Sequence, residues 1–167
     1  MYRTIPLLLL LTLLAACAGP AAPEETDPQI LTERYQTAIE NARDADTNQA
    51  LPVLDATDPD SSPYLELLGL TDDDLTAGAL SVSLMNVKAY GIAVLRPADG
   101  REENVREGLQ SFIDLQNQNF QQYLPDQYEI ARSARLETLA DGTVVLVMCP
   151  DQDAVLESIR SELEEAA

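Results

Sequence analysis

The sequence predicts an α+β domain: an antiparallel sheet with helices packed on one face, in the order ββαββα after an N-terminal helix. Three observations predict this class. Apolar and small residues alternate over residues 79–85, which is typical of a half-buried strand. An Asp-Gly pair at 141–142 separates two strand-like runs and indicates a hairpin. Between these regions, residues 102–123 place apolar side chains at helical spacing.

The first 16 residues have the features of a secretory signal. A positive charge at Arg3 precedes an apolar run over residues 7–16, which is too short to span a bilayer as a helix. The tetrapeptide LAAC at residues 14–17 matches the bacterial lipobox, in which the Cys thiol receives a diacylglyceryl group and the chain is cleaved before it. Two acyl chains give stable anchoring. We therefore expect a signal peptide over 1–16 and a lipidated Cys17, with an ordinary secretory cut site as the alternative.

Charge and composition limit the classes of partner. The chain has 167 residues with 10 basic and 29 acidic ones, a net charge of −19. Removal of the signal peptide leaves 167 − 16 = 151 residues and a charge of 9 − 29 = −20. Such a charge repels nucleic acid and anionic lipid alike, so no nucleic-acid partner is expected and attachment depends on the lipid at Cys17. We therefore expect the protein to lie at the extracytoplasmic face of the cell membrane.

The absence of histidine from the sequence limits the chemistry. It removes His-ligated zinc, the Ser-His-Asp triad and the commonest general base. With Cys17 modified, Cys149 has no second cysteine to pair with, and its apolar surroundings at 144–150 indicate a buried, inert thiol. No catalytic residue, cofactor or metal ion is predicted.

The N-terminal elements are predicted from residues that are typical of linkers, turns and helix ends. A Pro/Ala/Glu-rich linker covers residues 17–29, and a single α+β domain covers 30–167. Asp27 and Pro28 mark the start of a helix that runs to about Arg43. Residues 44–63 are polar and rich in turn formers and are predicted to form a loop that crosses the core once. Short helical pieces are expected at 64–68 and after Thr71, which would cap the second piece.

The C-terminal elements are predicted from changes in the spacing of apolar residues between the strand and the helix pattern. The strand over 79–85 and a more apolar one over 92–95 form either a hairpin or one long bent strand. Asp99 would cap a long helix that ends at Pro125, with Phe120 and Tyr123 on its buried face. Strands at 135–139 and 143–148 form the Asp-Gly hairpin, and Asp151 caps a final helix.

Several blocks resemble a known family. They are the lipobox, YLELLGLTDDDL, SLMNVKAYGIAVLRPADG, FQQYLPDQYEIARSARL and GTVVLVMCPDQDAV, in this order between residues 14 and 155. The chain resembles the bacterial lipoprotein family called domain of unknown function 4358 (DUF4358) from about Ile30 to Leu163. The resemblance implies lipoprotein character and an α+β fold, and carries no catalytic residue onto this sequence.

Few residues stand out as a candidate binding site. The turn MNVKAYG presents Asn86, Lys88 and Tyr90 beside a strand, and Lys88 is the single lysine of the chain. In so acidic a protein it could contact an anionic ligand or a neighbouring carboxylate. The acidic run at 72–74 is typical of a helix start, where the dipole favours negative charge. An EF-hand starting at Asp58 would need Gly at position 63 and Glu at position 69, where the chain has Pro63 and Gly69. A weak cation site at Asp58 and Asp60 remains as an alternative.

The function that these observations favour is a non-enzymatic, lipid-anchored binding or accessory module, held to the membrane through Cys17 and acting on a ligand or an envelope protein. One alternative is an extracytoplasmic hydrolase that uses a pair of carboxylates, as glycosidases do. Another is a lipoprotein that captures a small ligand. A cleft with two acidic groups of raised pKa would favour the hydrolase, and an exposed apolar patch would favour a protein partner.

Overall fold

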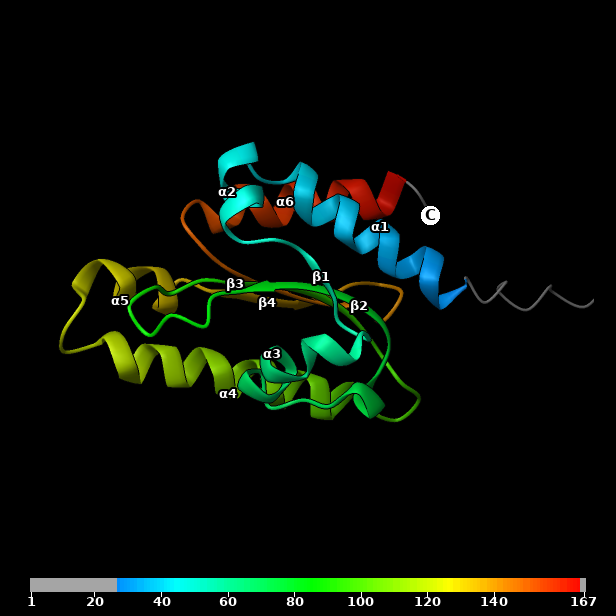
Figure 1. The fold of residues 1–167 in the computed structure, drawn as a ribbon, viewed down its shortest axis with the longest axis horizontal. Helices are drawn as coiled ribbons and strands as arrows, with labels where there is room; N and C mark the ends of the chain where they lie inside the picture. The colour runs from blue at the N-terminus through cyan, green and yellow to red at the C-terminus, as the bar shows by residue number, and fades with distance from the viewer. Residues whose placement is uncertain (1–26, 166–167) are drawn as a thin grey trace, which may run out of the picture.

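The fold is built around a five-stranded antiparallel sheet with the strand order β1-β2-β3-β5-β4. The computed structural model describes residues 27–165. The predicted signal peptide, Cys17 and most of the linker lie outside these residues. Figure 1 shows the sheet edge-on between two layers of helices. The α+β class and the antiparallel sheet are thus confirmed.

Residues 27–165 form five strands and six α-helices. The strands are β1 (Leu54–Asp55), β2 (Leu75–Val82), β3 (Gly91–Pro97), β4 (Arg135–Thr138) and β5 (Val144–Met148). The α-helices are α1 (Pro28–Asn41), α2 (Ala45–Ala50), α3 (Ser62–Leu67), α4 (Glu102–Phe120), α5 (Pro125–Arg132) and α6 (Gln152–Glu165). Two short 3-10 turns, η1 (Pro59–Ser61) and η2 (Asp72–Asp74), complete the set.

Helices cover both faces of the sheet, which corrects the expectation of a single covered face. Helices α1 and α6 pack on one face, and α3, α4 and α5 lie on the other (Figure 1). The reason lies in the central strands. Side chains alternate between the two faces of a strand, and apolar residues occupy both sets of positions in β3 and β5. A strand that is apolar on both sides must be covered on both.

Each face has its own core. Ile92 and Val94 of β3 lie beside Val147 and Val145 of β5 under α1 and α6. On the opposite face, neighbours of these residues pack against Phe112 and other side chains of α4. Strand β2 carries only small residues, Ala77, Ala79 and Ser81, toward α1, so this helix approaches the sheet closely.

Several predicted elements are confirmed. Helix α1 begins at Pro28, and the Asp27 carboxylate accepts a hydrogen bond from the Gln29 N–H at 2.9 Å. Strands β2 and β3 form the hairpin rather than one bent strand. Strands β4 and β5 form the second hairpin, where Gly142 has a φ of 90° that a side chain would disfavour.

The segment 44–63 differs from the predicted loop. It contains α2, the edge strand β1 and η1. The Asp44 carboxylate caps α2 through the Thr47 N–H, and β1 pairs with β2 at Leu54 and Leu80. The short helical piece predicted after Thr71 is the 3-10 turn η2, with Thr71 at its N-cap, and β2 begins directly at Leu75. Sheet pairing extends β2 toward its N-terminus and limits this helical piece to a single turn.

The ends of other elements also differ from prediction. Helix α4 begins at Glu102, so Asp99 is not its cap, and no side chain caps this end. The helix ends at Phe120, and Pro125 starts α5. Tyr123 therefore lies in the connection between the two helices and is 80% exposed instead of buried. Strand β2 stops at Val82, which leaves Leu84 outside the sheet.

The close approach to α4 of the segment that follows α3 generates a test. A Cβ at Gly108 of α4 would lie 2.7 Å from the Leu68 carbonyl oxygen and 2.8 Å from the Leu70 Cδ2. Gly to Ala usually stabilises an exposed helix by about 1 kcal/mol. We expect Gly108→Ala to lower the free energy of unfolding instead, measured by urea denaturation. Ser111→Ala, at an exposed position of α4, serves as the control and should be neutral or slightly stabilising. A more stable Gly108→Ala variant would contradict the close contact.

The turn before β2 gives a second test. The Asp74 carboxylate accepts hydrogen bonds at 2.9 Å from the Thr71 N–H and from the Thr71 hydroxyl. Burial acts to raise the pKa of Asp74, but these hydrogen bonds and the charge of Arg101 outweigh it, so the pKa is lowered. Because the folded-state pKa is the lower one, this stabilisation is present at neutral pH and is lost as the carboxylate becomes protonated.

We therefore expect Asp74→Ala to lower the free energy of unfolding by about 1 kcal/mol at pH 7, with a smaller difference from the wild type near pH 3. Denaturation curves at the two pH values measure both quantities. Asp73→Ala, at an exposed position of the same turn, is the control and should change neither value. An equal effect of Asp74→Ala at both pH values would refute the assigned role.

Candidate functional site

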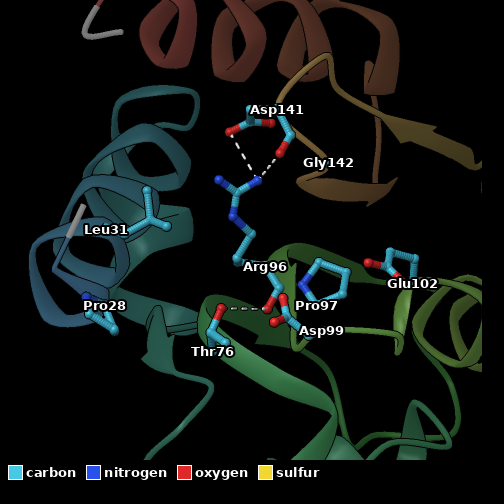
Figure 2. Close-up of a pocket in the computed structure, with 9 residues that line it drawn as sticks. All are labelled: Pro28, Leu31, Thr76, Arg96, Pro97, Asp99, Glu102, Asp141 and Gly142. Carbon is cyan, nitrogen blue, oxygen red and sulfur yellow. Dashed lines mark hydrogen bonds and ion pairs between the residues drawn. The ribbon is translucent and has the colours of Figure 1, made fainter. Parts of the chain in front are cut away.

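A hollow of about 650 Å³ lies where α1 begins beside the β4–β5 hairpin. Its charged lining residues are Arg96, Asp99, Glu102 and Asp141. Figure 2 shows the Arg96 guanidinium pointing toward Asp141, to which it is hydrogen-bonded through the Asp141 carbonyl oxygen. Arg96 is also 3.5 Å from the Asp141 carboxylate. The positive charge that lines this hollow is therefore already neutralised.

A chain of hydrogen bonds connects this ion pair to the core. The Thr143 hydroxyl donates to the Asp141 carboxylate at 2.9 Å, so the Tyr35 hydroxyl, 2.7 Å away, donates to Thr143. Tyr35 and Thr143 are buried, and burial raises the pKa of the Tyr35 hydroxyl. The arrangement fixes α1 against the hairpin. It is a structural network that satisfies its own polar groups.

A second pocket, of about 370 Å³, lies at the opposite end of α1. It is bounded by the end of α1, the start of α2, the start of β3 and the connection from β5 to α6. Its polar lining residues are Arg43, Asp44, Thr47, Tyr90, Cys149 and Asp151. This site, which we call the Arg43 pocket, brings together side chains from segments far apart in the sequence.

Arg43 is the central cation of the pocket. One terminal nitrogen donates to the Ser81 hydroxyl at 2.8 Å and to the Tyr90 hydroxyl at 2.6 Å, and the other donates to the Asn48 carbonyl at 2.6 Å. All three acceptors are neutral. Within residues 27–165 no carboxylate lies within 4 Å of Arg43, and its Nε is buried without a hydrogen-bond partner. An acidic protein thus keeps an unneutralised guanidinium beside a cavity.

The three predicted contact residues lie at this end of the molecule, in different environments. Tyr90 is buried and lines the Arg43 pocket, whereas Asn86 is exposed. The Lys88 ammonium lies over the Tyr90 ring, 5.4 Å from its centroid. Among the described residues Lys88 forms no ion pair with a carboxylate, so the alternative that it pairs with a neighbouring carboxylate is not supported. Sequence reasoning missed Arg43, because a helix-end arginine gives no distinctive signal.

Cys149 lines the pocket with a protonated thiol. The side chain is 3% exposed, and burial, which outweighs the nearby positive charge of Arg43, raises its pKa to about 11. Asp151 acts in the same direction as burial. The thiolate, which is the nucleophilic form, is thus scarce near neutral pH. The structure agrees with the predicted inert role.

The described residues also bear on metal binding and on membrane crossing. No group of three potential metal ligands occurs within residues 27–165. The Asp58 carboxylate of the considered cation site accepts a hydrogen bond from the Asp60 N–H and so caps η1. In this same part of the chain, no helix is both long enough and apolar enough to cross a membrane.

The described residues form an α+β domain in which helices cover both faces of the sheet. A family model, domain of unknown function (DUF4358), matches residues 54–149, which is more than half of the chain. The chain belongs to this family. The matched range includes all five strands together with α3, α4 and α5, while α1 and α6 lie outside it. No curated protein and no solved structure is significantly similar to the chain.

The buried thiol generates a test of the pocket. In a Cys17→Ala background, we expect a thiol reagent to modify Cys149 slowly at pH 8 in the folded protein and rapidly in urea. Because the pKa is raised, the folded state keeps the thiol proton to a higher pH than the unfolded state does. Stability should therefore be lost as the pH rises from about 9 toward about 11, and less so in Cys149→Ala. Rapid native modification at pH 8 would contradict this account.

Proposed function

We propose that this protein is a lipid-anchored binding module that acts without catalysis at the extracytoplasmic face of the cell membrane. The observation that carries the proposal is the tetrapeptide LAAC at residues 14–17, followed by a short linker to α1. The ten residues 18–27 of the predicted linker can span up to about 36 Å when extended. This length separates the folded domain from the lipid and leaves it free to meet a ligand or partner.

The arrangement of the fold supports an orientation in which the start of α1 faces the membrane and the opposite end of the domain faces away from it. Helix α1 begins at one end of the long axis, and the connection between β2 and β3 lies at the other end (Figure 1). Leu84, Met85 and Val87 of this connection are each more than half exposed. Clustered exposed apolar side chains are typical of interaction sites. A tether at the start of α1 would present this apolar tip and the Arg43 pocket away from the membrane, toward an envelope protein or a small ligand.

Binding is favoured over a carboxylate-based hydrolase by the state of the acidic groups. A glycosidase-like acid requires a carboxyl group with a raised pKa. The carboxyl groups of Asp44 and Asp74 instead have lowered pKa values. The lowered value of Asp44 comes mainly from the Thr47 backbone N–H. These two carboxylates stabilise the start of α2 and the turn η2, which is a structural role and not a catalytic one.

Lipid attachment is tested with the two cysteines of the chain. In cells supplied with a clickable fatty acid, we expect the wild type to be labelled and to sediment with the membrane. Cys17→Ala should lose the label and leave the membrane fraction. Cys149→Ala is the matched control and should keep both properties, because its thiol is buried in the folded domain. Full membrane retention of a processed Cys17→Ala variant would refute the anchor.

A further inference from the structure

The Arg43 pocket has opposite charges on different segments of its wall, and neither is neutralised by the protein. We propose that it binds a small zwitterion with the α-amino carboxylate group of an amino acid, whose carboxylate contacts Arg43 and whose ammonium contacts Asp151. This inference rests on the proposed function as a binding module and names the ligand class of its pocket.

The cationic wall is suited to a carboxylate. Arg43 has five N–H donors, of which three are used by Ser81, Tyr90 and Asn48. The unused donors belong to Nε, which is buried, and to the nitrogen that contacts Asn48. The second N–H of that nitrogen is the donor left for a carboxylate oxygen, and such a charge-assisted hydrogen bond is a strong one. Lys88, over the Tyr90 ring, adds a second positive charge near this wall.

The anionic wall is provided by Asp151, in the connection from β5 to α6. Its φ of 57° lies in the left-handed region, and no other non-glycine residue of 27–165 has a positive φ. Within the described residues its carboxylate accepts no side-chain hydrogen bond and forms no ion pair, whereas the carboxylate of Asp44 is used by the Thr47 N–H and hydroxyl. Asp151 is therefore available to an ammonium group.

The two charged side chains line the same pocket without forming an ion pair. Arg43 and Asp151 both belong to its lining, and their charged atoms are more than 4 Å apart. A ligand that carries both a positive and a negative group would supply a partner for each. The remaining lining is apolar or small, from Ala42, Pro150, Ala154 and Val155. A volume of about 370 Å³ accommodates one amino acid with a modest side chain.

Calorimetric titration of the full chain, purified as the cell makes it, tests the proposal. The probes are the common amino acids and D-alanine, with propionate and ethylamine as fragments that lack the ammonium or the carboxylate of alanine. We expect at least one amino acid to bind, and neither fragment to bind comparably, because each fragment leaves one wall charge unpaired. Binding of propionate as tightly as the amino acid, or no binding of any amino acid, would overturn the proposal.

Variants locate the binding site. Arg43→Gln and Asp151→Asn should each weaken binding roughly tenfold or more, while Arg106→Gln, which alters an arginine outside the pocket, should not. Because Arg43 also links α1 to β2 and β3, a pocket-filling variant guards against loss of folding. Ala154→Phe, on α6, should block binding, and Ser158→Phe, at an exposed position of α6 outside the pocket lining, should leave it intact.

Unchanged affinity in folded Arg43→Gln and Ala154→Phe would place any binding elsewhere and overturn the proposal. This result is independent of the lipid experiment. Absence of fatty-acid labelling in the wild type would refute the tether and leave the ligand site standing, and failed titrations with an intact tether would refute the ligand alone.

Discussion

Burial of the central strands on both faces is the constraint on which the rest of the structure depends. Strands β3 and β5 carry apolar side chains on each side, and the resulting two cores need two layers of helices. Helix α4 covers one face along its length. Helices α1 and α6 cover the other, and the Arg34 guanidinium donates to the Leu163 carbonyl oxygen to join them. Both pockets then arise where α1 meets the ends of the sheet.

The position of small residues determines how closely these layers approach. Ala77 and Ala79 of β2 face α1, and Gly108 of α4 lies against the α3 segment. Close approach leaves little room for water, so polar groups at these contacts require partners within the protein. Tyr35 and Thr143 meet this requirement next to the Arg96–Asp141 ion pair. In the Arg43 pocket, the hydroxyls of Ser81 and Tyr90 accept hydrogen bonds from Arg43 and hold it beside the end of β2.

Charge distinguishes the two pockets more than shape does. The chain has nearly three acidic residues for each basic one, so a cation without a carboxylate partner is unexpected. Arg96 follows the expected behaviour and pairs with Asp141. Arg43 is held by neutral acceptors beside a cavity, where an unpaired charge is unfavourable unless a counter-charge arrives. A ligand that brings this charge would gain the interaction without displacing an existing ion pair.

The sequence by itself determined the class of fold, both hairpins and the start of α1, because alternating apolar residues, an Asp-Gly turn and an Asp-Pro cap act over a few neighbouring residues. It also indicated the buried state of Cys149. Local pattern could not decide that β2 begins at Leu75, that helices cover both faces, or that Tyr123 is exposed. Those outcomes depend on which surfaces meet. The Arg43 pocket was decided by tertiary structure alone, since packing of α1 and α6 on the sheet brings Arg43, Tyr90 and Asp151 together from distant segments.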